Sequence, residues 1–292
     1  MFRKEEVVLR RKPLIFLLVI PFLFFILSHT IPFFYGIGLS FYDWRENFVG
    51  FTNYLSVFND AMFWDSLKFT FIYAVVVAGA MTFFGLFFGI FINHLGRGQM
   101  LVKSVLLIPW AISLTAWGLL GQIALSRQFG VVNDVLVRLG ILESRLAWLG
   151  DPTLAKISVM LSRISKDVWF SALLFLVARQ TIPSELYDES KVCGAGPWQT
   201  LCYVTLPMLK PTMLFVTTIL FIFALQEFDL VFALTRGGPG FATEVASINI
   251  FRHGVRYGNY EYGTAVAAVW SLIVSVFVIV VFAPLQRRIM EK

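Results

Sequence analysis

Six long apolar runs, separated by polar segments, dominate the pattern along the chain. At a rise of about 1.5 Å per residue, a helix of about 20 residues crosses a hydrocarbon core of about 30 Å. The runs cover residues 13–37, 69–92, 105–125, 157–177, 212–232 and 263–283. This pattern predicts an all-α membrane protein with six transmembrane helices.

The first run allows a second interpretation, because it follows a basic segment, residues 1–12. A cleaved signal peptide also begins with positive charges and an apolar stretch. The run is too long for the core of a signal peptide, and no small-residue cleavage site follows it. We therefore interpret residues 13–37 as the first span and residues 1–12 as an N-terminal tail.

Composition supports the membrane assignment. Hydrophobic residues make up 58% of the 292 residues and charged residues only 14%, with a mean hydropathy of +0.76. Soluble domains have about a quarter of their residues charged. The net charge of +6 requires no nucleic-acid partner, because basic cytoplasmic loops account for it.

The distribution of Lys and Arg predicts the orientation. If both termini share one side, that side also holds loops 93–104 and 178–210 and the basic tail 284–292. Lys and Arg are then about twice as dense there as in the opposite loops, and the side richer in these residues is cytoplasmic. We expect both termini, and the segment 183–211, to lie in the cytoplasm.

The segment 183–211 is amphipathic and charged. Ser184 suits a helix N-cap, Lys191 suits a last turn, and Gly194 suits a helix end. Pro197 then opens a second short helix. Two short helices joined at a glycine hinge indicate a docking element on the membrane surface; the alternative is an ordinary connecting loop.

Charged residues within the apolar runs are costly in lipid and indicate a polar interior. The fifth run contains Gln226, Glu227 and Asp229, and on a continuous helix Glu227 and Asp229 point about 200° apart. They form either a hydrogen-bonding solute path or a helix end held by Arg236. In the fourth run, adjacent Lys166 and Asp167 are expected to need separate partners or water.

Catalytic and cofactor motifs are missing from the sequence. It contains no G-x-x-x-x-G-K-[ST] phosphate loop, no H-E-x-x-H and no G-x-S-x-G, and its three histidines are scattered. The two cysteines, Cys193 and Cys202, form neither a disulfide framework nor a metal-ligand spacing. We expect a chain that is not an enzyme by itself and holds no cofactor or metal.

The segment 183–211 resembles the "EAA" loop of binding-protein-dependent ABC importer permeases of type I. The resembling stretches are Glu185-Leu186-Tyr187, Asp188-Glu189-Ser190, Gly194-Ala195, Trp198-Gln199, Val204-Thr205-Leu206-Pro207 and Pro211. Departures are Asp188-Glu189-Ser190 in place of E-A-A and Cys193 in place of Asp. The fourth run has Ser165 and Trp169-Phe170 where the family has a Trp and a Pro-Phe pair.

Further motifs extend the resemblance over nearly the whole chain. They are Gly50-Phe51-Thr52-Asn53-Tyr54, Gly130-Val131-Val132-Asn133, Leu139-Gly140 and Trp148-Leu149-Gly150-Asp151-Pro152. The stretch Leu234-Thr235-Arg236-Gly237-Gly238-Pro239, with Thr243, is similar to the T-x-G-G-P signature of the sugar-importer subclass, and in particular of the maltose-type larger permease partner.

The resemblance implies roles for individual residues. ATPase coupling would involve Glu185, Tyr187, Asp188, Glu189, Ser190, Gly194, Ala195 and Pro207. The substrate path would include Gln226, Glu227, Asp229 and Trp169, and a loop facing the binding protein would include Thr235, Gly237, Gly238 and Pro239.

The resemblance also implies partners and a location. The chain would be the permease subunit of an ATP-driven importer of a sugar or sugar-like solute, in the cytoplasmic (inner) membrane of a bacterium or archaeon. Its partners would be a second homologous permease, two ATPase subunits that bind ATP and Mg, an extracytoplasmic solute-binding protein and membrane lipid. The alternative is a secondary transporter, or a non-catalytic membrane subunit without an ATPase.

Overall fold

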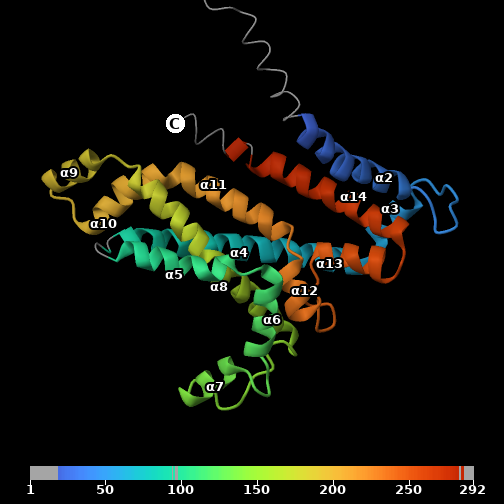
Figure 1. Cartoon of the computed structure of the whole chain (residues 1–292), viewed down its shortest axis with the longest axis horizontal. Coiled ribbons are helices and arrows are strands. Elements are labelled where there is room, and N and C mark those ends of the chain that lie inside the picture. Colours follow the sequence, from blue (N-terminus) through green and yellow to red (C-terminus); the bar gives the residue numbers. More distant parts are fainter. Residues whose placement is uncertain (1–18, 94, 96–97, 283, 286–292) are drawn as a thin grey trace, which may run out of the picture. The chain divides into compact units, whose positions relative to one another are not determined.

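The computed structural model describes residues 19–93, 95, 98–282 and 284–285, and within these ranges it contains helices and no strand (Figure 1). The expected N-terminal tail 1–12, the start of the first span and most of the tail 284–292 lie outside the described residues. The chain divides into two compact units, residues 1–60 with 250–270 and residues 61–249 with 271–292. Each unit is described by itself.

The first unit begins with a continuous helical segment, Val19–Leu39, which includes the π-helix η1 (Ile26–Thr30) and α2 (Ile31–Leu39). The helix α3 (Thr52–Asn59) follows a turn. Two residues of its first turn, Asn53 and Tyr54, make hydrogen bonds to Ser40 at the end of α2. The Asn53 side chain donates to the Ser40 carbonyl at 2.9 Å, and the hydroxyls of Ser40 and Tyr54 lie 2.6 Å apart. The unit also contains the end of α13 (Ala246–Phe251), η3 (Arg252–Arg256) and α14 (Tyr260–Phe277) up to residue 270. The remainder of α14 and η4 (Val278–Phe282) belong to the second unit.

Three long helices form the core of the second unit: α4 (Ala61–Asn93), α8 (Pro152–Gln180) and α11 (Leu206–Leu225). The contact between α4 and α8 is the most extensive between elements. Its close approach depends on glycine, because a Cβ atom added to Gly89 would lie 2.7 Å from the Ala172 carbonyl oxygen. The Gly85-x-x-x-Gly89 spacing, which lets another helix approach closely, is therefore used for packing within the chain.

Two of the expected spans are broken helices. The run 105–125 forms α5 (Gln99–Ala111) and α6 (Leu114–Ala124), which meet at 89°. Ser113 caps α6 by accepting a hydrogen bond from the Ala116 backbone N–H at 3.2 Å. The run 212–232 is interrupted at residues 226–228, where α11 ends and α12 (Asp229–Thr235) begins. Each interruption frees backbone groups inside the apolar bundle.

Length and composition identify four described helices that could cross a membrane, or five if the bent α5 and α6 pair counts as one span. The four are Val19–Leu39, Ala61–Asn93, Pro197–Leu225 and Tyr260–Val281. The expected fourth span corresponds to α8, which is long enough with 29 residues but contains Arg163, Lys166 and Asp167. Six crossings therefore remain a prediction.

The segment 183–211 contains α9 (Ser184–Val192), α10 (Pro197–Thr200) and the π-helix η2 (Leu201–Thr205), which continues into α11. Pro183, not Ser184, occupies the N-cap position, without a side-chain cap. Gly194 adopts φ +75°, a left-handed conformation that other L-residues adopt only with strain. The expected helix, glycine turn and second helix are thus present, although the second helix merges with the next span.

The polar segment 126–156 contains α7 (Val131–Arg138), which ends just before Gly140 at φ +71°. The buried Asn133 side chain fixes the segment by donating to the carbonyls of Ser126 and Leu146 and accepting from the Trp148 indole N–H at 3.0 Å.

Candidate functional site

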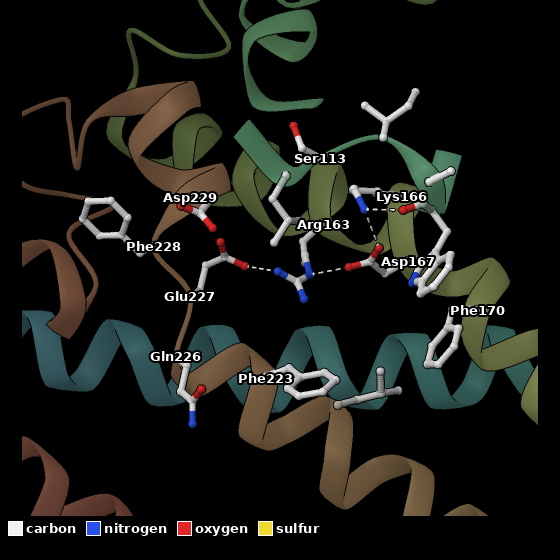
Figure 2. A pocket seen from close by; sticks show the side chains of 15 residues that line it. Ser113, Arg163, Lys166, Asp167, Phe170, Phe223, Gln226, Glu227, Phe228 and Asp229 are labelled. Carbon is white, nitrogen blue, oxygen red and sulfur yellow. Dashed lines mark hydrogen bonds and ion pairs between the residues drawn. The ribbon is translucent and has the colours of Figure 1, made fainter. Parts of the chain in front are cut away.

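A cavity of about 670 Å³ lies in the second unit where the two helix breaks meet α8 (Figure 2). We call it the helix-break cavity. Its walls come from residues 110–114 between α5 and α6, residues 226–229 between α11 and α12, and one face of α8. Small-molecule sites typically have this size and combine apolar walls with a few polar groups.

The α8 wall arises from helical periodicity. The cavity-lining residues of α8 lie three or four residues apart or next to each other, which places them on one face of the helix. They are Arg163, Lys166, Asp167 and Phe170. Arg163, Lys166 and Asp167 are 7%, 4% and 8% exposed. Charges that are this buried require partners.

The partners form one network across α4, α8 and the α11–α12 break. Arg163 pairs with Glu227 through Nη1 and with Asp167 Oδ2 at 2.8 Å through Nε. Glu227 is 2% exposed, accepts from the Tyr73 hydroxyl at 3.1 Å, and also accepts from the Leu230 backbone N–H at 3.1 Å. Glu227 therefore caps the start of α12 and compensates the charge of Arg163.

Lys166 and Asp167 each have a separate partner, as expected, since Asp167 contacts Arg163 and Lys166 contacts the Trp110 carbonyl, and they also pair with each other. Lys166 Nζ lies 3.0 Å from Asp167 Oδ1 and donates to the Trp110 carbonyl oxygen at 3.2 Å. The flexible lysine side chain folds back toward its neighbour, so the direction of its Cα–Cβ bond does not decide its contacts. Lys166 also supplies a donor near the end of α5, where the helix break leaves carbonyls without helical partners.

The structure brings Glu227 and Asp229 into the same cavity, as Figure 2 shows. The expected separation of about 200° assumed a continuous helix, and the break at residues 226–228 removes that condition. Arg163 rather than Arg236 pairs with Glu227, so the alternative of a helix end held by Arg236 is wrong for this residue.

Gln226 and Asp229 are exposed and line the cavity, whereas Trp169 does not line it. The Trp169 ring packs on Phe88 of α4 at a centroid distance of 4.8 Å. Its neighbour Phe170 lines the cavity instead and stacks on Trp110 at 5.1 Å with an interplanar angle of 7°. The i, i+4 pair Arg163 and Asp167 was the sequence signal for this wall, but periodicity alone does not identify Tyr73 or Trp110.

The residues expected to couple to an ATPase lie on and around α9. Glu185, Asp188 and Glu189 are exposed, and Asp188 pairs with Lys191 at 2.9 Å. Ser190 is buried, and its hydroxyl lies 3.2 Å from that of Thr200. Tyr187 lies beneath the Arg179 guanidinium, 4.9 Å from it, and its hydroxyl is 3.3 Å from that of Thr205.

A second cavity of about 590 Å³ adjoins this segment and is lined by Tyr187, Ala195 and Trp198, among others. Pro207 is exposed near the start of α11. The segment 183–211 therefore presents acids outward on α9, while hydrogen bonds join the other face of α9 to Thr200 of α10 and Thr205 of η2.

The expected binding-protein-facing loop, residues 235–243, is a compact turn. The hydroxyls of Thr235 and Thr243 lie 2.7 Å apart, and Thr243 also donates to the Gly238 carbonyl at 2.7 Å. Gly237 has φ +85°, and the Gly238–Pro239 peptide is cis. The fully buried Thr243 fixes the loop from within.

Comparisons with known proteins agree with these features. The family model described as "Binding-protein-dependent transport system inner membrane component" matches residues 81–292. The sulfoquinovosyl glycerol transport system permease protein SmoG of Agrobacterium fabrum is 36% identical over 222 residues, which are 76% of this chain and 71% of that protein. The trehalose/maltose transport system permease protein MalF of Thermococcus litoralis is 32% identical over 236 residues, 81% of this chain and 79% of that protein.

A solved structure shows the same fold. A chain of a bacterial ABC transporter involved in the import of the acidic polysaccharide alginate superposes with a TM-score of 0.83 at 23% identity, covering 98% of this chain and 99% of that chain. The helical architecture is thus that of an ABC importer transmembrane domain. By the matched family model and the similarity of both relatives, the chain belongs to the binding-protein-dependent inner membrane components, the permeases of ABC importers.

Proposed function

We propose that the chain is the permease subunit of an ATP-driven importer that moves a sugar or sugar-like solute into the cell. The observation that carries this proposal is the helix-break cavity, a polar and aromatic site within an apolar bundle. The names of SmoG and MalF, which refer to sulfoquinovosyl glycerol and to trehalose and maltose, support a carbohydrate solute.

The proposal includes a topology and partners. Six crossings with both termini in the cytoplasm would place segment 183–211 at the inner surface of the cytoplasmic membrane of a bacterium or archaeon. A second homologous permease would complete the pathway, and a binding protein would deliver solute to the outer loops, including residues 235–243. Two ATPase subunits would bind ATP and Mg, and this chain would hydrolyse nothing itself.

The proposed coupling element is α9. Its outward acids Glu185 and Glu189 would enter a groove on the ATPase, and ATP-driven closure of the ATPase would displace the helix. Gly194, at φ +75°, forms the pivot between α9 and the α10–α11 segment. The buried contact between Ser190 and Thr200 links the two sides of this pivot.

Broken helices also occur in secondary transporters, where they surround the substrate. The breaks at residues 112–113 and 226–228 therefore agree with solute transport of either kind. Membership in the binding-protein-dependent family favours the ATP-driven importer.

The test is Gly194→Asp in the chain assembled with its second permease, ATPase and binding protein. An L-residue is less favourable than glycine at this left-handed position, although Asp tolerates it better than most, and the substitution also adds bulk and charge at the turn. We expect ATP-dependent solute uptake to fall at least about tenfold, an effect of about 1.4 kcal/mol on coupling, with normal membrane insertion. Uptake into proteoliposomes and ATP hydrolysis stimulated by the loaded binding protein are the measurements.

Gly140→Asp is the matched control, because Gly140 ends α7 at φ +71° and, like Gly194, has open space where a Cβ would lie. It introduces the same charge and comparable backbone strain away from α9, so uptake should change little. Normal solute-stimulated ATP hydrolysis and uptake in Gly194→Asp would contradict the coupling role.

A further inference from the structure

The charges that line the helix-break cavity are unequal, with three carboxylates and two cations among its described lining residues. We propose that this cavity accepts uncharged carbohydrates and disfavours anionic ones, and that Asp229 is the residue that discriminates between them. The inference rests on the proposed transport function and adds to it the charge class of the solute.

Both cations in the cavity are already paired with carboxylates. Arg163 contacts Glu227 and Asp167, and Lys166 contacts Asp167 and the Trp110 carbonyl. All four side chains are buried, with at most 8% of each residue exposed. A carboxylate or sulfonate on a solute would have to displace one of these ion pairs, and breaking a buried ion pair strands a charge in a poorly solvated site.

Asp229 is the acid of the cavity that is accessible to solvent, because Asp167 and Glu227 are buried. It is exposed, and its carboxylate makes no hydrogen bond or ion pair with any residue that the structure describes. A carboxylate only accepts hydrogen bonds, so it matches the hydroxyl groups of a sugar and repels an anion. Gln226 is also exposed and lies in the break between α11 and α12. Its amide both donates and accepts hydrogen bonds.

Aromatic rings supply the apolar part of the site. Trp110 is 46% exposed and stacks in parallel on Phe170, and Phe223 is 52% exposed across the cavity. Broad ring faces beside a few polar groups suit a pyranose, which has C–H faces and a rim of hydroxyls. These contacts carry no preference for charge, so the preference arises from Asp229 against the background of the two paired cations.

The experiment compares two probes that differ by one carboxylate, methyl β-glucoside and methyl β-glucuronide. Binding of each at millimolar concentration is measured by saturation-transfer NMR on the full chain with its second permease in nanodiscs, without the binding protein. We expect the glucoside to bind roughly five- to tenfold more tightly, the effect of one carboxylate repulsion at partial solvent exposure.

Asp229→Asn should reduce this preference to less than about twofold by raising the affinity for the glucuronide. The substitution keeps the shape of a side chain that has no partner to lose among residues 19–93, 95, 98–282 and 284–285. Asp65→Asn is the matched control, because Asp65 lines a different cavity of the same unit and its loss should leave the preference unchanged.

Equal binding of both probes by the unaltered chain, a stronger glucuronide signal, or no binding of either would overturn the inference. An unchanged preference in Asp229→Asn would overturn the role of Asp229. The proposed function is tested separately by ATP-dependent uptake in the complete importer: glucoside binding without any uptake would contradict transport and leave the charge preference standing.

Discussion

Arg163→Met is expected to lower the free energy of unfolding by about 3–5 kcal/mol, the usual cost of removing one partner of a buried ion pair. Glu227 is 2% exposed and would lose the cation that compensates it. Asp167 would keep Lys166 at 3.0 Å, so the cost arises mainly at Glu227. The measurement is unfolding of the purified chain in mixed micelles titrated with denaturing detergent.

The double variant Arg163→Met with Glu227→Gln provides the decisive comparison. It removes both charges, so most of the free energy of unfolding that Arg163→Met loses should be recovered. The double variant should then lose less than the sum of the losses in the two single variants. Tyr73→Phe, which removes only the hydroxyl donor at 3.1 Å, should cost about 1 kcal/mol. A double variant as unstable as the sum of the singles would show that the pair is not coupled.

Gly89→Ala is expected to destabilise the chain by about 1–3 kcal/mol, the usual cost of overpacking an interior. The added Cβ would lie 2.7 Å from the Ala172 carbonyl oxygen and 3.0 Å from Phe175 Cβ, so α4 and α8 would have to separate. The same detergent titration measures the effect.

Gly79→Ala is the control on the same helix, since no heavy atom lies within 4 Å of a Cβ added there. It should leave stability unchanged or raise it by up to about 1 kcal/mol, because alanine restricts the unfolded backbone more than glycine. Equal effects of the two substitutions would argue that helix propensity, and not the α4–α8 contact, governs the result.

The sequence predicted much of the helical framework because membrane spans and helix stops have local signals. The run 69–92 lies within α4, and Gly194 takes the left-handed conformation of a glycine that ends a helix. These features depend on residues close together in the chain.

The helix-break cavity was predicted only in part. Gln226, Glu227 and Asp229 were recognised as polar positions, but the assumption of one straight helix separated Glu227 from Asp229. The bend between α5 and α6 has a local signal in Pro109 and the capping Ser113, which hydropathy averages out. The pairing of Arg163 with Glu227 joins different helices, and no local pattern encodes it.

The position of two cations on one turn of α8 has a mechanical consequence. Arg163 holds the break before α12 through Glu227, and Lys166 holds the break after α5 through the Trp110 carbonyl. A rotation of α8 about its own axis would therefore displace both helix breaks at once. The two breaks are thus mechanically coupled through α8, and a motion that widens one would also move the other.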